Sequence, residues 1–422
     1  MKNKLADFNF FYSLLLPVVQ YGVRCHYRRL IVKGRENVPW GEHFIFAPCH
    51  QNALMDALIV LEITHSKVVF LARADIFQKP VARFFLTWLR ISPVYRIRDG
   101  RDQLSRNEAI FQTSREVIES GVPLCLMAEG RHNDRHQLLP LVKGMFRIAC
   151  SAQKELGNEP LFIVPVGVDY DHYEDLYHSV CINIGKPISV TPFMEEYESN
   201  EPVALNQMRA ALTTALRGQM HHVGSKERYD DEYAYCHLRT QETLRELRLP
   251  NTVWGRFMAR KHVSEALAAL PEEEREPLYD QGRTFAEDCQ RRRVPLWFAS
   301  KGWTPAKGVL SLGAVLLTLA GISFIWKYWL LSNVVVYLPT KPLVKRMIQD
   351  PQFRSSVDYG IRLLLQFINA IVVFIVFTCT HNVLWGLGMV GLCMLSAWVT
   401  PRIFVMLRDV WYGLKSPGKT SE

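Results

Sequence analysis

The stretch FIFAPCHQNALMDAL, residues 44–58, changes within a few residues from a pattern typical of a buried strand to one typical of a helix. Its first five residues are apolar and suit a buried strand, whereas good helix formers begin at Ala53 and continue through Leu61. Asn52 is suited to the N-cap of that helix. The stretch therefore predicts a strand, a short loop and a helix, with His50 in the loop directly after the strand.

Similar strand-like runs recur over residues 32–224 and are separated by helix-length segments. The runs read KVVFLA, VPLCLMAEG, LFIVPVGVDY and VCINIG, and one helical pattern between them is RDQLSRNEAIFQTSREVIESG. This alternation predicts an α/β domain with a largely parallel central sheet flanked by helices. Ligands of such sheets bind at the carboxyl ends of the strands, where His50 is expected.

Three other regions differ from this domain in composition. Residues 1–31 join an apolar run to a basic end, which suits an amphipathic helix in a membrane interface; a helix packed on the protein's own core is the alternative. Residues 225–300 are charged and helical, and we expect a helical insert or lid there. Residues 301–422 are strongly apolar and predict C-terminal transmembrane helices.

The C-terminal region contains up to four apolar segments: residues 308–326, 328–338, 363–380 and 383–398. The first is long enough to cross about 30 Å of hydrocarbon. Lysines and arginines lie in the central connection and are absent from the turn at His381 and Asn382, so we expect two hairpins with cytoplasmic ends. The first pair is short for two spans, which leaves a re-entrant segment or one long helix open. A soluble protein with a very apolar helical core is the alternative.

The formal charge of +9 predicts a polyanionic partner or a charged surface. Much of the basic excess flanks apolar segments, which favours membrane lipid over nucleic acid. The nine cysteines lack the paired spacing of disulfide frameworks or zinc sites, so we expect reduced thiols in a protein that faces the cytoplasm. The early Asp7 and the lack of a small-residue cleavage site argue against a cleaved signal.

His50 and Asp56 lie six residues apart and form a candidate catalytic pair. On an ideal helix two such positions point about 120° apart, so the side chains meet only if His50 lies in the loop and turns back toward Asp56. A carboxylate bonded to one ring nitrogen fixes the tautomer and raises the basicity of the other nitrogen, which can then deprotonate an alcohol. Two polar residues that are merely neighbours are the alternative.

Charged and glycine residues follow two other strand-like runs. One segment, CLMAEGRHNDRHQLLPLVKG at residues 125–144, has anion-binding and hydroxyl-binding character, and its glycines allow close approach of the backbone. The other, SPVYRIRDGRD at residues 92–102, adds arginines at another strand end. The two segments contribute Glu129, Gly130, Arg131, Lys143, Arg96 and Arg98. Together with the histidine and aspartate they predict a site for a phosphate-bearing substrate.

Four blocks, in this order, resemble those of the glycerophospholipid acyltransferases of the bacterial lysophosphatidate acyltransferase type. HQNALMD is similar to the family's histidine block, and SPVYRIR places Arg98 at the family's arginine position with Arg96 close by. AEGRHNDRHQLLPLVKG matches the Glu-Gly block, including its downstream lysine. IVPVGV supplies the strand with a proline, Pro165. The resemblance covers residues 32–224.

The resemblance implies the glycerolipid acyltransferase fold and a membrane-bound O-acyltransferase of phospholipid synthesis. The acyl donor would be acyl-CoA or acyl carrier protein, as a co-substrate; no metal or other cofactor is implied. The acceptor would be glycerol 3-phosphate, dihydroxyacetone phosphate or 1-acylglycerol 3-phosphate, and the catalytic domain would face the cytoplasm from the inner membrane.

The resemblance also implies roles for individual residues. His50 would act as the base, oriented by Asp56, and Glu129 would accept a hydrogen bond from a substrate hydroxyl. The phosphate would be held by Arg98 and Lys143, with Arg96 and Arg131 in support.

Two departures from the usual family pattern are visible. Five residues separate His50 from Asp56 where four are common, which is closest to the glycerol-3-phosphate and dihydroxyacetone phosphate branch. Arg131 and His132 stand where the family usually has Thr-Arg, so the arginine is shifted by one position. An acyltransferase for another lysolipid, such as an aminolipid, fits the same blocks. A non-catalytic membrane scaffold and a metal-dependent phosphohydrolase are alternatives from other classes.

Overall fold

The computed structural model describes these residues of the chain: 10–64, 67–73, 77–78, 80, 83, 86, 89–94, 104–173, 177–323, 325, 327–329, 336, 340–349 and 351–416. The chain divides into two compact units. The first comprises Met1–Tyr21, Val32–Asp169 and Cys181–Met220, and the second comprises Gly22–Ile31, Tyr170–Val180 and His221–Glu422.

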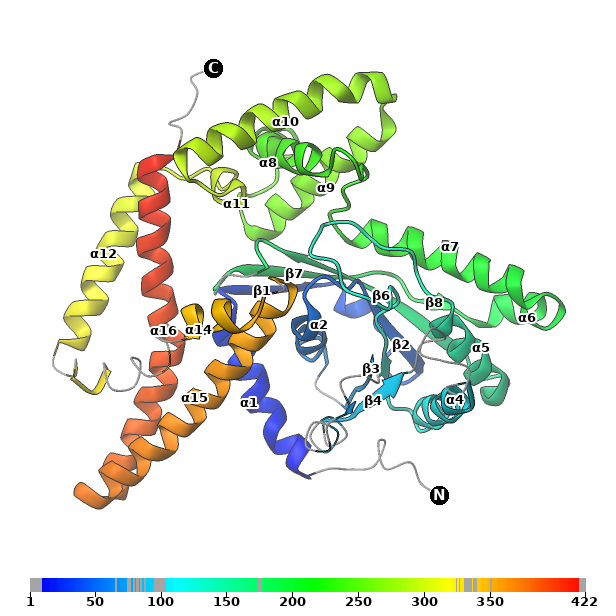
Figure 1. The fold of residues 1–422 in the computed structure, drawn as a ribbon, viewed down its shortest axis with the longest axis horizontal. Helices are drawn as coiled ribbons and strands as arrows, with labels where there is room; N and C mark the ends of the chain where they lie inside the picture. Colours follow the sequence, from blue (N-terminus) through cyan, green and yellow to red (C-terminus); the bar gives the residue numbers. More distant parts are fainter. Residues whose placement is uncertain are drawn as a thin grey trace. The chain divides into compact units, whose positions relative to one another are not determined.

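One eight-stranded sheet forms among the described residues, in the order β1-β7-β6-β2-β5-β3-β4, with β8 paired to β6 (Figure 1). Its strands are β1 (Arg29–Lys33), β2 (His43–Pro48), β3 (Val69–Arg73), β4 (Ile91–Val94), β5 (Leu124–Cys125), β6 (Leu161–Tyr170), β7 (Ser179–Ile184) and β8 (Ile188–Ser189). The strands β6, β2, β5, β3 and β4 pair in parallel, whereas β8 is antiparallel to β6. The predicted α/β fold with a largely parallel sheet is confirmed.

The centre of the sheet is formed by β2. This strand pairs with β6 from His43↔Leu161 to Pro48↔Val166 and with β5 on its other side. Ile45, Phe46 and Ala47 have no exposed surface, as expected of a strand buried on both faces. Because the pairing is parallel, β2 and β5 end at the same edge of the sheet. The loops that follow these two strands therefore meet there.

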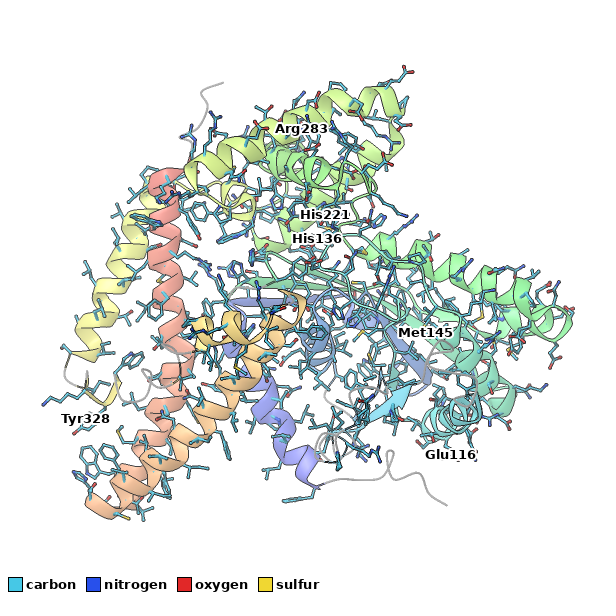
Figure 2. The ribbon with its side chains drawn as sticks, viewed as in Figure 1. Glu116, His136, Met145, His221, Arg283 and Tyr328 are labelled. Atoms are coloured by element: carbon cyan, nitrogen blue, oxygen red, sulfur yellow. The ribbon has the colours of Figure 1, made fainter. Side chains whose placement is uncertain are left out.

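The helices of the sheet region are α1 (Phe10–His26), α2 (Ala53–Val60), α4 (Leu104–Glu119), α5 (Gly144–Leu156), α6 (Met194–Ser199) and α7 (Glu201–Gln219). Helices α4 and α5 pack against each other (Figure 1). One stripe of α5 is fully or almost fully buried at positions three or four residues apart, namely Met145, Ile148, Ala149 and Ala152. Met145 is labelled in Figure 2.

A buried glutamine joins α5 to β6. The Gln153 amide group donates to the carbonyl oxygens of Gly157 at 3.1 Å and Glu159 at 2.9 Å, and its oxygen accepts from the Leu161 N–H at 2.8 Å. These bonds satisfy backbone groups in the turn between the two elements. They fix the position of α5, whose first turn follows the Glu-Gly loop.

One face of α1 carries exposed apolar side chains. Phe10, Leu14 and Val18 lie four residues apart and are 63%, 61% and 40% exposed. Side chains at this spacing share one face of a helix. The stripe is the kind of surface that the predicted interfacial helix needs.

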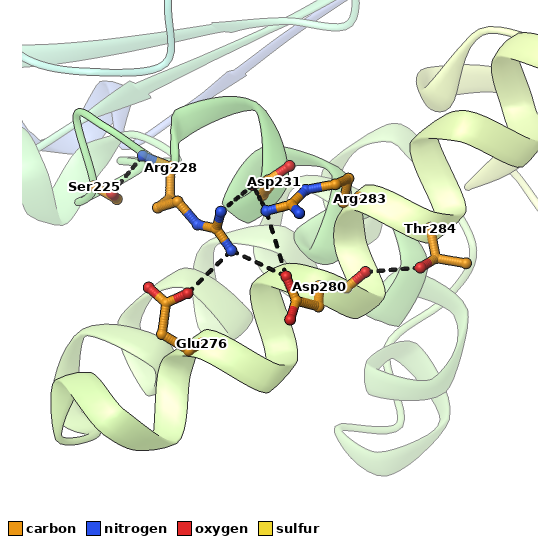
Figure 3. A network of polar contacts seen from close by, with 7 residues as sticks. All are labelled: Ser225, Arg228, Asp231, Glu276, Asp280, Arg283 and Thr284. Atoms are coloured by element: carbon orange, nitrogen blue, oxygen red, sulfur yellow. Dashed lines mark hydrogen bonds and ion pairs between the residues drawn. The ribbon is translucent and has the colours of Figure 1, made fainter.

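The charged region of the second unit is helical, as expected. It contains α8 (Tyr229–Glu246), α9 (Val253–Ala269), α10 (Glu272–Arg292) and α11 (Leu296–Ala299). Arginine and aspartate side chains join α10 to α8 and to the turn before it (Figure 3). Arg228 contacts Asp280 at 3.1 Å, and Arg283 contacts Asp231 at 3.2 Å. Exposed pairs of this kind contribute little singly and more as a network.

Three helices of the described part are long and apolar enough to cross a membrane. They are α12 (Pro305–Ile322), α15 over its residues Phe353–Thr380, and α16 (Val383–Lys415). The whole of α15 is Pro351–Thr380, and the short α14 is Thr340–Met347. Helices α15 and α16 form a hairpin, and α12 also packs on α16 (Figure 1). Many of their apolar side chains are exposed, for example Leu384 at 78%, which indicates association with a membrane. Most of the second predicted run, residues 328–338, lies outside the described residues.

Within the second unit, the carboxylate of Asp409 on α16 contacts two basic side chains from other segments. Asp409 Oδ2 lies 3.0 Å from Arg28 Nη1 and 3.3 Å from Lys301 Nζ. Burial lowers the pKa of the Lys301 ammonium to about 8, although Asp409 opposes the shift. Arg28 lies between α1 and β1, so this pair of contacts links the start of the sheet to the last helix of the same unit.

Replacing Gln153 by leucine should destabilise the protein by about 2–4 kcal/mol, because the buried N–H of Leu161 and two carbonyl groups lose their partner. We expect the melting temperature, followed by circular dichroism, to fall by roughly 5–10 °C. The matched control is Gln112→Leu on α4, where the side chain is exposed. Equal melting temperatures for the two variants would contradict the assigned role of Gln153.

Candidate active site

His50 lies in the loop between β2 and α2 and turns back toward the helix. Its Nδ1 is 2.8 Å from Oδ2 of Asp56, whose carboxylate has no exposed surface. Nε2 of His50 has no hydrogen-bond partner among the described residues, and the His50 side chain is 15% exposed. The predicted pairing of His50 and Asp56 is confirmed, with one ring nitrogen held and the other available.

The same carboxylate oxygen organises the backbone of the loop. Besides the histidine, Asp56 Oδ2 accepts hydrogen bonds from the N–H of Gln51 at 2.8 Å and of Asn52 at 2.7 Å. Asn52 occupies the N-cap position as predicted, but its side chain makes no capping bond. The loop therefore closes around the side chain of Asp56.

Ala53 adopts a left-handed backbone conformation between the two catalytic candidates, with φ of 43°. A residue with a Cβ atom pays about 1–2 kcal/mol for this conformation. The strained turn allows the chain to reverse over five intervening residues and still bring His50 onto Asp56. The unusual spacing noted in the sequence thus has a structural counterpart at Ala53.

Glu129 connects the loop after β5 to the loop after β2. Its Oε1 accepts from the N–H of His50 at 2.7 Å, and its Oε2 accepts from the N–H of Leu139 at 2.8 Å. Burial raises the pKa of the Glu129 carboxyl to about 8, and the two backbone hydrogen bonds partly offset the shift. Its partners are thus backbone groups on both sides of the site, which sequence reasoning did not predict.

Gly130 follows Glu129 with φ of +65°, a conformation that favours glycine. A Cβ atom at this position would meet Val142 at 3.1 Å, which is close. The N–H of Val142 donates to the carbonyl oxygen of Ala128 at 2.8 Å. Lys143, the next residue, occupies the N-cap position of α5, so the chain returns to the Glu-Gly segment just before this helix begins.

His132 lies against His50, a contact that sequence reasoning missed. The ring centres of His50 and His132 are 5.4 Å apart, and the rings are nearly perpendicular. The N–H of Asn133 donates to the carbonyl oxygen of His50 at 3.0 Å, which holds the loop in place. The available signal was the replacement of the usual family Thr-Arg by Arg131 and His132.

The predicted site residues fall into three groups. His50, Asp56 and Glu129 share direct contacts. Gly130 and Lys143 lie at the two ends of the same loop, whereas Arg131 is exposed within it. Arg96 and Arg98 lie outside the described residues; the strand that precedes them, β4, runs parallel to β3.

A neutral imidazole with Nδ1–H directed to a carboxylate presents Nε2 as a proton acceptor. The thiol nearest to it in sequence, Cys49, is fully buried, and burial raises its pKa well above the ordinary value. Cys49 is therefore held as a thiol, which makes it a poor nucleophile. The arrangement suits removal of a proton from a substrate hydroxyl.

Two comparisons with known proteins found a similarity. Residues 29–169 match the family model described as Acyltransferase. Among solved structures, the chain is similar to the crystal structure of the 1-acyl-sn-glycerophosphate (LPA) acyltransferase PlsC from Thermotoga maritima. The identity is 19%, the match covers 49% of this chain and 79% of that chain, and the TM-score is 0.36. A comparison with curated proteins found no match.

The matched segment contains every candidate catalytic and binding residue, from His50 to Lys143. The resemblance predicted from the four blocks is confirmed at the level of the family. Residues 29–169, about a third of the chain, match the acyltransferase model, and this match supports an enzyme of the acyltransferase class.

Proposed function

We propose that the enzyme transfers an acyl chain from acyl-CoA or acyl carrier protein to a hydroxyl of a glycerol-phosphate acceptor. The acceptor is glycerol 3-phosphate, dihydroxyacetone phosphate or 1-acylglycerol 3-phosphate. The observation that carries the proposal is the 2.8 Å contact between His50 Nδ1 and Asp56 Oδ2, which leaves Nε2 as the base.

In the reaction, Nε2 of His50 takes the proton of the acceptor hydroxyl while its oxygen attacks the thioester carbonyl carbon. The C–O bond forms, and the resulting tetrahedral intermediate collapses with cleavage of the C–S bond. Asp56 stabilises the imidazolium that forms and holds the ring in the required tautomer. The amides of Gln51 and Asn52 are engaged by Asp56, so other donors must stabilise the oxyanion.

The acceptor phosphate would bind to basic residues on the loops of this edge. Lys143 stands at the start of α5, where backbone N–H groups and the helix dipole favour an anion. Next to it, Gly144 has open space around it, because an added Cβ would meet nothing within 4 Å. Arg98, Arg96 and Arg131 are the further candidates that the family resemblance implies.

Glu129 has a positioning role in this proposal. Its two oxygens hold the backbone of His50 and Leu139, so that the base and the phosphate-binding loop keep a fixed separation. Each oxygen has a second lone pair, which could accept a hydrogen bond from a substrate hydroxyl. That substrate contact stays a prediction.

The apolar helices of the second unit would keep the enzyme in the membrane that holds its lipid substrate or product. We place it in the inner membrane with the catalytic domain in the cytoplasm. The support is the basic connection between the predicted hairpins, where Lys345 and Arg346 lie in the last turn of α14.

The proposal is tested by acyl transfer with the purified full-length chain, comparing the three acceptors with acyl-CoA and with acyl carrier protein. We expect His50→Ala to lose at least 10²–10⁴-fold in rate, because it lacks the general base. Asp56→Asn should be severely impaired as well. The control is His43→Ala, which removes a histidine bonded to Ile118 and Glu159. Wild-type-like turnover by His50→Ala would refute the mechanism.

Arg98→Ala should raise KM for phosphate acceptors about 10–100-fold, the cost of losing a hydrogen bond to a charged group. A phosphate-free acceptor such as a monoacylglycerol should show no comparable change. Arg147→Ala is the matched control, since this exposed arginine pairs with Glu201 on α7. An equal loss on both kinds of acceptor would remove Arg98 from the phosphate site.

Ala53→Gly should keep acyl-transfer activity, because glycine adopts positive φ without strain. Ala53→Val should lower activity at least tenfold, since a β-branched residue strongly resists this conformation and the loop would no longer bring His50 onto Asp56. Ala57→Val, later in α2, is the control for the added volume. If Ala53→Val matched this control in rate and melting temperature, the strained turn would be irrelevant to the site.

A further inference from the structure

His132 is held beside the base from both ends of a short loop. On the carboxyl side, the Asn133 N–H bonds the His50 carbonyl and the Asn133 side chain donates to the Gln137 carbonyl at 3.2 Å. On the amino side, Glu129 accepts from the N–H of His50. These contacts fix the loop relative to His50 on either side of His132, which is only partly exposed.

The proposed reaction includes a second proton transfer, to the departing sulfur, for which a separate acid is better suited than the base that takes the hydroxyl proton. When the C–S bond breaks, the departing sulfur is an alkyl thiolate, whose conjugate acid has a pKa of about 8.5, as in cysteine. An imidazolium, with a pKa of about 6.5, is acidic enough to protonate it. The attacking oxygen and the departing sulfur are bonded to the same carbon. The ring centres of His50 and His132 are 5.4 Å apart, so one ring can contact the attacking oxygen while the other contacts the departing sulfur.

We propose that His132 is a second catalytic residue, which delivers a proton to the sulfur of the departing thiol. This inference rests on the proposed function. His50 Nε2 receives the hydroxyl proton as the C–O bond forms, and protonated His132 gives its proton to sulfur as the C–S bond breaks. The products are the ester and the free thiol. Transfer of the proton from His50 to His132, directly or through water, restores both rings.

The charges around His132 fit this division of labour. Asp56 contacts His50 and stabilises the proton there. The two oxygens of the Glu129 carboxylate accept hydrogen bonds from the backbone N–H groups of His50 and Leu139. Arg131 and Asp134 flank His132 in the same loop with opposite charges. Among the described residues, His132 is an imidazole whose ring lies against that of His50.

The test compares two donors that carry the same acyl chain. One is the donor that the wild-type enzyme uses, acyl-CoA or acyl carrier protein; the other is an aryl thioester, whose thiolate is stable without a proton. With the natural donor, His132→Gln should lose roughly 100-fold or more in kcat, because it lacks the general acid. With the aryl thioester the loss should fall to less than threefold. His132→Phe, which keeps an aromatic ring against His50 without a proton, should behave like His132→Gln.

The exposed His262 on α9 supplies the control variant His262→Gln, which should match the wild type with both donors. An equal loss with both donors would overturn the inference, because it would indicate binding or packing by His132. Recovery of activity in His132→Phe, or no loss in either variant, would overturn it as well. The proposed function fails separately, if the wild type transfers no acyl chain from any donor or if His50→Ala remains active.

Discussion

Asp56 is the group around which the candidate active site is built. One of its carboxylate oxygens accepts three hydrogen bonds, from the ring of His50 and from the N–H groups of Gln51 and Asn52. A buried carboxylate is tolerated only when its charge is met by such donors. The loop is therefore forced to close around it, and the direction of the His50 ring follows from that closure. The strained φ of Ala53 is a local cost of the same constraint.

Much of the fold could be predicted because its signals are local. The change from a strand-like to a helix-like pattern at Asn52 predicted the strand, the loop and the helix. Helix geometry required His50 to lie outside α2 if its side chain was to meet Asp56. The alternation of strands and helices indicated the parallel sheet. The long apolar runs at residues 308–326 and 383–398 predicted helices that are present as α12 and α16.

The parts that could not be predicted depend on contacts between distant segments. The sequence does not state that β5 pairs with β2, and only that pairing brings Glu129 to the backbone of His50. The position of His132 depends on the same loop. The left-handed turn at Ala53 could not be predicted from the sequence either, because alanine rarely adopts this conformation. Arg96 and Arg98 lie outside the described residues, so their predicted role rests on the family resemblance.

Glu129 connects the loop after β2 with the loop after β5. Its carboxylate bridges the backbone after β2 to the backbone after β5, so each loop helps to hold the other in position. A chimera that exchanged only the histidine loop with a relative would join a foreign backbone to the native carboxylate. An exchange of this site between related proteins would therefore have to move both loops together, with their strands left in place.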